Sequence, residues 1–560
     1  MSTLSRNGLI ARFHGYGRER SKWLTGGEFE RHILSASGHP LPYAGTPGIA
    51  WLLSSLSKGD GWSPVREGDN LIALQGSHAN VTLEPGGQFE LSGTPFASLE
   101  RIWEEAAKFT NQVDDLLGPH GFRQVALGYT PFADISEISW VPKGRYSVMQ
   151  RHLGRTGALA HHMMKGTCAV QASYDFSDEQ DCARKVRLAT AMGPLTTAMF
   201  ANSPVTAGKP NGFMSFRGHI WTQTDPARTG LPTAASEFGF ERWVDYLLDV
   251  PMMFRRDPAG AWLAANGQTF RQWMESSTPP ADSDWELHQT SVFPEVRVKS
   301  QIEVRGADCV PLPLAMSFIA LFKGLFYCDQ AVQDAGQILE RFTSHGTRED
   351  RFAHACREGL QGVVGERRLA AWAEELVTVA AQGLGRIAPS ERAWLHPLIR
   401  SVEHGASPAR TLLARLGEVA TPAELMASCG MAADDEASHS IVSDQYLTRG
   451  LRAARMTERV VALSRRARSR LQDQDAADLN DEVRKARRQL KKLRRELQRV
   501  QEHALASGLD QPTLSAVRGA LEPVEAELDG GVQLGEAGKV AATARHARRA
   551  LRQLVAPAED

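Results

Sequence analysis

The stretch VTLEPGGQFELSG, residues 81–93, contains two glutamates whose spacing could place them in one site. Glu84 and Glu90 share one parity of position, whereas the apolar residues around them share the other. Because successive side chains of a β-strand point to opposite faces, a strand here would have a carboxylate face and an apolar face. The Pro-Gly-Gly insert would bend or bulge that strand. Its carboxylate face either meets water or lines a site.

Three other stretches repeat this two-faced pattern. Their polar positions are Glu28 and Glu30 in residues 24–33, Gln171 and Ser173 in residues 168–176, and Arg297, Lys299, Glu303 and Arg305 in residues 293–308. The third stretch predicts a strand from Glu295 to Arg305 with a bend near Ser300, since an unbent strand of that length would be unusually long. Any one of these strands alone is well explained as the solvated side of an antiparallel sheet.

Taken together, the glutamates predict a cation site. Glu28, Glu30, Glu84, Glu90 and Glu303 would repel one another on a single sheet face unless cations hold them. Hard divalent ions prefer carboxylate oxygens, so we expect Mg²⁺. The basic residues of the third stretch suit phosphate and carboxylate groups. Mg²⁺ held by acids beside basic residues is typical of phosphoryl transfer from a nucleoside triphosphate. The sequence contains neither GxxxxGK[ST] nor the protein-kinase motif set, which argues against those folds.

The elements that would position these residues change character near residue 310. From about residue 20 to 310, alternating strand patterns, Gly/Pro turns and short amphipathic helices predict an α+β domain with an antiparallel sheet. From about residue 311 onward, helical periodicity predicts a mostly helical part. We predict one catalytic domain over residues 1–420, a helical connector over 421–470, and a basic helical bundle or coiled-coil extension over 471–560.

The predicted extension carries a heptad seam. Its apolar positions, spaced alternately by four and three residues, are Leu479, Val483, Ala486, Leu490, Leu493, Leu497 and Val500. Basic residues cover the outer faces, which could contact nucleic acid or an acidic membrane surface. No aromatic residues are interleaved, and charged flanks around a seam favour packing on another helix. Nucleic acid is therefore the less favoured partner, and self-association through these helices is left open.

The net charge of the chain does not indicate a strongly charged partner such as nucleic acid. The 560 residues carry a formal net charge of −1, with 42% hydrophobic and 23% charged residues. The six cysteines lack CxxC or other metal-like spacing, which favours a reducing compartment. The N-terminus lacks the apolar core of a signal peptide, and no apolar run approaches the ~20 residues needed to cross a bilayer. We predict a cytoplasmic protein with no membrane partner.

Several blocks of the sequence resemble one known family. They are GGEFE at 26–30, LEPGGQFELSG at 83–93, WVPKGRY at 140–146, the run at 200–230, DYLLDVPM at 245–252, and FPEVRVKSQIEVRGAD at 293–308. In order and approximate spacing they are similar to plant and proteobacterial glutamate-cysteine ligases, over about residues 8–420. The resemblance implies a glutamine-synthetase-like fold, in which helices surround an antiparallel sheet curled into a funnel. It also implies that ATP phosphorylates the γ-carboxylate of L-glutamate and that the amine of L-cysteine displaces the phosphate, the first step of glutathione synthesis.

The resemblance assigns roles motif by motif. The implied metal ligands are Glu28, Glu30, Glu84, Glu90, Glu303 and Gln171. Arg217 and Arg305 are the implied catalytic residues that recognise the glutamate carboxylate, and Ser173 is an implied substrate contact. Arg297 and Lys299 are implied to bind the phosphates of ATP.

Two positions depart from the family pattern. Phe29 stands where the motif GTEHEK has His, and Ser173 stands where VQVNLDF has Asn. These departures leave two alternatives open: a γ-glutamyl ligase that uses another amine, and a catalytically weakened scaffold that acts through its C-terminal helices. The C-terminal extension itself lies outside the family pattern.

Overall fold

A computed structural model describes residues 4–59, 61–230, 232–257, 259–416 and 419–430. The chain divides into two compact units, Met1–Ala433 and Asp434–Asp560, and the described residues belong to the first. The predicted heptad seam, the basic extension and most of the predicted connector lie outside the described residues.

A nine-stranded antiparallel sheet forms the centre of the first unit. Its strand order is β14-β15-β7-β1-β5-β4-β3-β2, and β6 pairs with the far end of β1. The bounds are β1 Thr25–Ser35, β2 Ser63–Glu67, β3 Asn70–Gln75, β4 Asn80–Leu83, β5 Phe89–Ser92, β6 Phe122–Val125, β7 Ala169–Tyr174, β14 Val296–Val298 and β15 Ile302–Asp308. The path has two distinct ends, so the sheet is not a closed barrel. The predicted α+β class with a large antiparallel sheet is confirmed.

Strand β1 connects the parts of the sheet. It pairs with β7 from Thr25 to Phe29, with β5 from Glu28 to Arg31, and with β6 from His32 to Ser35. A Cβ atom on Gly27 would lie 2.9 Å from Cδ1 of Ile319, so glycine lets a helix approach the strand closely. Gly27 and Phe29 therefore face that helix, and Glu28 and Glu30 face the other way.

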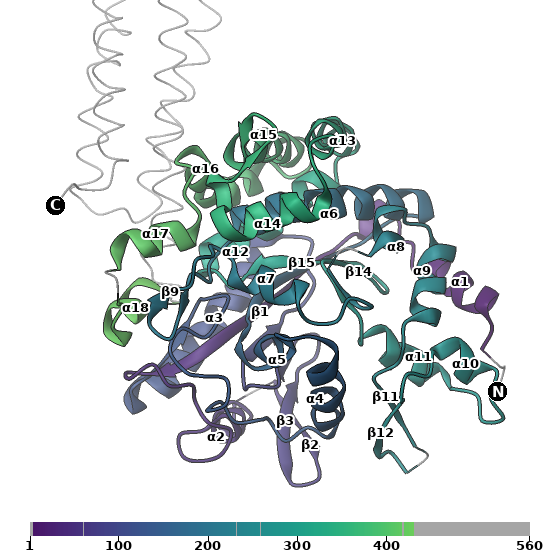
Figure 1. The fold of residues 1–560 in the computed structure, drawn as a ribbon, viewed down its shortest axis with the longest axis vertical. Helices are drawn as coiled ribbons and strands as arrows, with labels where there is room; N and C mark the ends of the chain where they lie inside the picture. The colour runs from purple at the N-terminus through teal and green to yellow at the C-terminus, as the bar shows by residue number, and fades with distance from the viewer. Residues whose placement is uncertain (1–3, 60, 231, 258, 417–418, 431–560) are drawn as a thin grey trace, which may run out of the picture. The chain divides into compact units, whose positions relative to one another are not determined.

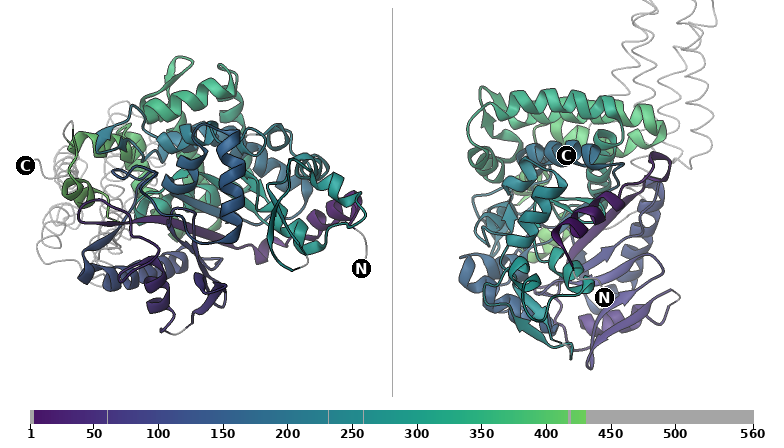
Figure 2. Two further views of the ribbon diagram at one scale, coloured as in Figure 1. Left: turned by 60° about the horizontal axis from the view of Figure 1, so that its bottom comes forward. Right: turned by 90° about the vertical axis from the view of Figure 1, so that its right-hand side faces the viewer.

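Helices cover the apolar face of the sheet. α12 (Leu312–Phe326) packs on β1 and β7, α6 (Glu179–Met199) on β15, and α3 (Leu99–Leu117) on β1 and β6 (Figure 1). After α12 follow α13 Asp329–Thr343, α14 Arg348–Glu358, α15 Leu369–Ile387, α16 His396–Glu403, α17 Pro408–Arg415 and α18 Pro422–Ser428. In the right-hand view of Figure 2 the green helices after residue 311 lie together above the purple N-terminal strands. Apart from the short pair β16 (Val363–Val364) and β17 (Arg367–Arg368), the described part after 311 is helical, as predicted.

No helix among the described residues is by itself both long and apolar enough to cross a bilayer. Only α12 and α13 taken together meet those limits, and the pair is bent by 100° at its break.

A second set of elements includes some that line a cavity over the acidic face. Their bounds are α4 Gly144–Thr156, α5 Ala160–Gly166, α7 Phe216–Thr222, α9 Phe240–Asp249, α10 Phe270–Met274, α11 Asp282–Gln289, β10 Thr229–Gly230, β11 Phe254–Arg256, β12 Trp262–Ala264 and β13 Phe293–Pro294. Figure 1 shows α9, α10, α11, β11 and β12 grouped along one side of the molecule. The remaining elements are α1 Arg6–Gly15, α2 Ile49–Leu56, α8 Thr233–Ser236, β8 Val205–Thr206 and β9 Lys209–Pro210.

Both stretches predicted as single bent strands are hairpins. In the first, the Gly87 amide donates to the Glu84 carbonyl at 2.9 Å, and Gly87 adopts φ +87°, which lets the chain reverse. In the second, Val298 pairs with Ile302 across the turn. The prediction of one strand was wrong because alternation of side chains continues through a tight reversal. The reversal places Arg297 directly opposite Glu303.

We expect Phe29→Ala to lower the free energy of unfolding by about 3 to 5 kcal/mol, because the ring is 1% exposed and its loss would leave a cavity beneath β1. Urea denaturation measures this change. The matched control Leu263→Ala removes a side chain that is 39% exposed and should stay within about 0.5 kcal/mol of the wild type. Equal effects of the two substitutions would contradict the assignment of Phe29 to the core.

Candidate active site

A cavity of about 290 Å³ lies over the acidic face of the sheet. Nine of the residues predicted for the site line it: Glu28, Glu30, Glu84, Glu90, Gln171, Arg217, Arg297, Lys299 and Arg305. Glu303 and Ser173 are not among the lining residues. A larger cavity, of about 450 Å³, lies among α16, α17 and α18, and none of the predicted residues lines it. The convergence of acidic and basic groups makes the smaller cavity the candidate active site.

The acidic wall is built by strand register. Glu30 of β1 lies directly opposite Glu90 of β5, and Glu28 lies opposite Gln171 of β7. The carboxylate of Glu30 accepts hydrogen bonds from the Ala169 amide at 2.7 Å and from Nε2 of Gln171 at 2.9 Å. Oε1 of Glu90 accepts from the Ser92 hydroxyl at 2.6 Å. Glu84 joins them from the turn after β4.

These carboxyl groups are costly to ionise. Burial, then the charges of Glu90 and Glu303, raise the pKa of Glu28 to about 7. Burial and the charges of Glu84 and Glu90 raise the pKa of Glu30 well above its ordinary value. Burial and Glu84 also raise the pKa of Glu90. Acids with raised pKa values in surroundings of low dielectric constant bind protons or cations readily, and such groups are common at functional sites.

Glu303 has the opposite electrostatic surroundings. Its Oε2 accepts from Nε of Arg297 at 2.6 Å, and its Oε1 lies 2.8 Å from Nζ of Lys299. Burial favours the neutral acid, but Arg297, Lys299 and Arg305 outweigh it and lower the pKa of Glu303 to about 2. Its carboxylate is thus the partner of the basic residues, while its role as a metal ligand stays a prediction. Arg297 and Lys299 lie together at the cavity wall, where they were predicted to bind phosphates.

Gln171 and Arg305 join the acidic and basic sides. The side-chain amide of Gln171 donates to Glu30, and its oxygen accepts a hydrogen bond from Nη1 of Arg305. Because an amide has one donating and one accepting end, these two partners fix its orientation.

Arg217 is positioned by the start of α7. The hydroxyl of Ser215 caps this helix by accepting from the Gly218 amide at 3.0 Å, and it donates to Asp308 of β15 at 2.9 Å. Nη2 of Arg217 donates to the Arg305 carbonyl at 3.0 Å, and Nη1 lies 3.9 Å from Oδ1 of Asp308. The helix cap and β15 therefore hold both predicted catalytic arginines at one side of the cavity.

Apart from Tyr146, which the sequence favours slightly as a pocket residue, the wall that faces the sheet was not predicted. It consists of Arg145, Tyr146, Met149, Met163, Met164, Trp221, Met253, Phe254, Thr290, Ser291 and Phe293. The block WVPKGRY carried a signal for Tyr146, whose hydroxyl donates to the Leu83 carbonyl beneath Glu84. Nζ of Lys143 donates to the same carbonyl at 3.0 Å, and burial, followed by Arg145, lowers the pKa of Lys143 to about 8. Scattered methionines and aromatic residues have no spacing that distinguishes a cavity wall from a core.

The two departures from the family pattern lie away from the cavity surface. Phe29 is buried on the helix-covered face of the sheet. Ser173 lies opposite Gly26 and Glu303, and a Cβ atom on Gly26 would lie 2.4 Å from its hydroxyl oxygen. Neither side chain lines the cavity, and the role of Ser173 as a substrate contact stays a prediction.

The acidic wall of the cavity offers oxygen atoms to a divalent cation. The groups on the acidic wall that could bind a cation are carboxylate oxygens, which Mg²⁺ prefers, whereas the amide oxygen of Gln171 accepts from Arg305. Within the described ranges of the chain, no group of three or more His, Cys, Asp or Glu side chains is arranged so that it could hold a metal ion. The donor types fit Mg²⁺, and the side chains would have to draw together around it.

The sequence profile of glutamate-cysteine ligase family 2 matches residues 24–443. The chain belongs to this family. The match includes every predicted site residue, from Glu28 to Arg305.

Curated relatives agree with the family assignment. The chain is 38% identical over 419 residues to the protein named glutamate–cysteine ligase, chloroplastic, of Brassica juncea, covering 73% of this chain and 80% of that protein. It is 37% identical to the protein of the same name from Arabidopsis thaliana, with 73% and 79% coverage. The one from Medicago truncatula is also 37% identical, with 73% and 82% coverage.

The fold is also similar to a solved structure. A glutamate–cysteine ligase from Francisella tularensis, crystallised in complex with AMP, aligns with a TM-score of 0.50 over 95% of this chain and 98% of that chain, at 13% identity. At that identity the likeness concerns the fold alone.

We expect the raised pKa of Glu28 to make the stability of metal-free protein fall with rising pH. The folded state binds this proton more tightly than the unfolded state, so stability declines between the unfolded pKa of about 4.5 and the folded pKa of about 7. Glu28→Gln removes the buried charge and should stabilise the protein by about 1 to 3 kcal/mol at pH 8, and by much less at pH 5. Urea unfolding in EDTA at both pH values measures the difference. An equal effect at both pH values would contradict the assigned shift.

Proposed function

We propose that this chain is an ATP-dependent glutamate-cysteine ligase that carries out the first step of glutathione synthesis. The observation that supports it most directly is one cavity, in a member of this ligase family, that joins four acids, two of them buried, to five basic side chains. The substrates are then L-glutamate, L-cysteine and ATP, as the names of the relatives suggest.

The basic side of the cavity suits the two anions that must react. The γ-carboxylate of glutamate and the triphosphate repel each other, and fixed positive groups offset that repulsion while holding them in line. We assign Arg217 and Arg305 to the amino-acid carboxylates. We assign Arg297 and Lys299 to the phosphates, where a bound phosphate would share them with Glu303.

The acidic side suits Mg²⁺. Glu28, Glu30, Glu84 and Glu90 would hold the ion, with the oxygen of Gln171 beside them, and Glu303 is the outermost candidate ligand. When bound, Mg²⁺ neutralises charge on the phosphates. The raised pKa values of Glu28, Glu30 and Glu90 are consistent with this role, since burial and like charges raise them and a cation would offset the repulsion.

The reaction follows in two balanced steps. An oxygen of the γ-carboxylate attacks the γ-phosphorus of ATP, the bond to the β-phosphate oxygen breaks, and γ-glutamyl phosphate and ADP form. The amine of cysteine then attacks the acyl carbon, phosphate leaves, and a cavity carboxylate accepts the amine proton. The methionine and aromatic wall excludes water, which would otherwise hydrolyse the acyl phosphate.

The proposals on cellular location and self-association rest mainly on the sequence. All six cysteines lie within the described residues and are free and buried there, which is consistent with a reducing compartment. We infer a cytoplasmic location on that ground, although the named plant relatives are chloroplastic. Self-association through the predicted heptad seam stays a prediction.

We expect ADP release to require both L-glutamate and L-cysteine. Glycine, L-alanine and L-2-aminobutyrate at equal concentration should support a kcat/KM at least about 10-fold lower, since the acceptor pocket must distinguish side chains by contact. A coupled ADP assay with each amine measures this. Preference for another amine would favour the alternative γ-glutamyl ligase, which the Ser173 departure motivates. A flat calorimetric titration with Mg²⁺ and ATP would instead favour the weakened scaffold.

We expect Glu90→Gln to lower kcat/KM by at least about 100-fold while the protein stays folded, because the amide loses the charge that would bind Mg²⁺. The concentration of Mg²⁺ that gives half-maximal activity should rise. Steady-state kinetics over a Mg²⁺ series measure both. Glu104→Gln on the exposed side of α3 is the matched control and should leave activity unchanged. Wild-type turnover in the Glu90 variant would contradict the proposed cation site.

A further inference from the structure

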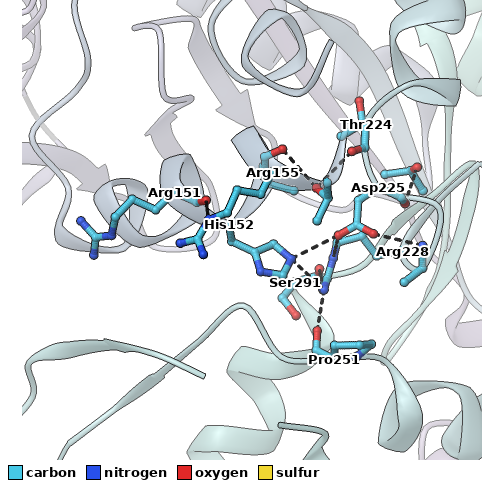
Figure 3. Close-up of polar contacts among 12 residues, drawn as sticks. Arg151, His152, Arg155, Thr224, Asp225, Arg228, Pro251 and Ser291 are labelled. Carbon is cyan, nitrogen blue, oxygen red and sulfur yellow. Dashed lines mark hydrogen bonds and ion pairs between the residues drawn. The ribbon is translucent and has the colours of Figure 1, made fainter. Parts of the chain in front are cut away.

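A buried ion pair lies behind the wall that faces the sheet, outside the cavity itself. Nε of Arg228 donates to Oδ2 of Asp225 at 2.6 Å, and the two side chains are 1% and 5% exposed (Figure 3). Neither residue lines the cavity. A buried charge pair of this kind requires a full set of hydrogen-bond partners to be tolerated.

The turn after α7 fixes the acid of this pair. Oδ1 of Asp225 accepts from the Ala227 amide two residues ahead at 3.1 Å, and the Asp225 carbonyl accepts from the Thr229 hydroxyl at 2.7 Å. Burial alone would raise the pKa of Asp225, but hydrogen bonds from His152 and Arg228 and the charge of Arg228 lower it to about 2. The pair is therefore ionised at neutral pH.

The guanidinium group of Arg228 connects two loops. Nη1 donates to the Ser291 carbonyl at 3.1 Å, and Nη2 donates to the Pro251 carbonyl. The main-chain carbonyl of Arg228 accepts a hydrogen bond from the Phe293 amide at 2.7 Å. Met253 and Phe254 lie two and three residues after Pro251, and both line the cavity together with Ser291 and Phe293. One planar side chain thus sets the separation of two loops that form the cavity wall.

The same pair also contacts α4. Nε2 of His152 lies 3.3 Å from Oδ2 of Asp225, and one turn later the Thr156 hydroxyl donates to the Thr224 carbonyl at 3.2 Å (Figure 3). α4 carries Tyr146 and Met149 of the cavity wall. Three separate wall segments therefore meet at the Asp225–Arg228 pair.

We propose that Arg228, paired with Asp225, is a positioning residue that holds the methionine and aromatic wall at a fixed distance from the acidic sheet face and so sets substrate affinity. The functional part of this inference rests on the proposed ligase activity. The claim that Arg228 holds the wall in position does not depend on catalysis.

Arg228→Lys is the test variant, because lysine keeps a positive charge beside Asp225 but cannot reach both carbonyls with a planar fork. We expect the KM of at least one of the three substrates to rise 10-fold or more while kcat changes less than threefold, the pattern of lost uniform binding. Hydrogen exchange should become faster in peptides covering residues 251–254 and 290–295. Unchanged KM values, or unchanged exchange in these peptides, would overturn the proposal.

Arg351→Lys is the matched control. Arg351 is also a buried arginine, 7% exposed, whose Nη1 donates to the carbonyls of Thr343, His345 and Gly346, but it lies on α14, outside the cavity wall. This substitution should cost similar stability without changing KM or exchange in the wall peptides. If it raises KM as much as Arg228→Lys does, the effect is general destabilisation and the proposal is wrong.

A second variant applies if Arg228→Lys does not fold. Phe293→Leu alters the wall directly at a half-buried side chain and should raise the same KM, whereas an unchanged KM would overturn the link between wall and affinity. Absence of ADP release in the wild type would overturn the proposed function instead. The exchange comparison between Arg228→Lys and Arg351→Lys would then still decide whether Arg228 positions the wall.

Discussion

The mutual repulsion of buried carboxylates on one face of the sheet is the constraint on which the rest of this structure depends. The register of β1 against β5 places Glu30 directly opposite Glu90, an arrangement that like charges disfavour. It persists because the opposite face of β1 is fixed in the core by Phe29 and by the close contact of Gly27 with α12. A shift of the strand by one residue would turn the core residues into the cavity and the acids into the core. Apolar packing on the helix-covered face of the sheet therefore offsets the repulsion between the carboxylates on the opposite face.

The positive charges that offset these carboxylates come from β14 and β15, at one end of the sheet. β15 and β14 lie beyond β7, so their arginines reach the acids only across the cavity or through Gln171. Glu303 pairs with these basic side chains, and their charges explain why its pKa is lowered while that of Glu28 on the same face is raised. The environments of these two carboxyl groups push their pKa values in opposite directions, which favours the proposed cation-binding role for Glu28 and shows Glu303 as the partner of the basic side chains.

The sequence predicted the sheet wall of the cavity far better than the opposite wall. Alternation at Glu28 and Glu30 reports directly which face a side chain occupies, because a strand has a period of two. It did not show that residues 81–93 and 293–308 reverse direction, since the parity of positions is the same in a bent strand and in this hairpin. The opposite wall comes from loop residues such as Met253, Ser291 and Phe293, whose placement depends on tertiary contacts with Arg228. No local period encodes such contacts.

The sheet wall and the opposite wall of the cavity are held in place by different interactions. This difference affects which residues of the site can vary within one family. The sheet wall is fixed by backbone pairing and a large apolar core, which tolerates replacement of a residue such as His by Phe29 on the covered face. The opposite wall has only short backbone pairs, β13 with β10 and β11 with β12, and the guanidinium group of Arg228 joins its segments through hydrogen bonds to two main-chain carbonyls. Contacts to main-chain groups place no demand on the side chains of the loops. Those side chains can therefore change without loss of the wall's position. Chemistry that requires fixed charges belongs on the sheet, and discrimination among amino-acid side chains belongs on the loops.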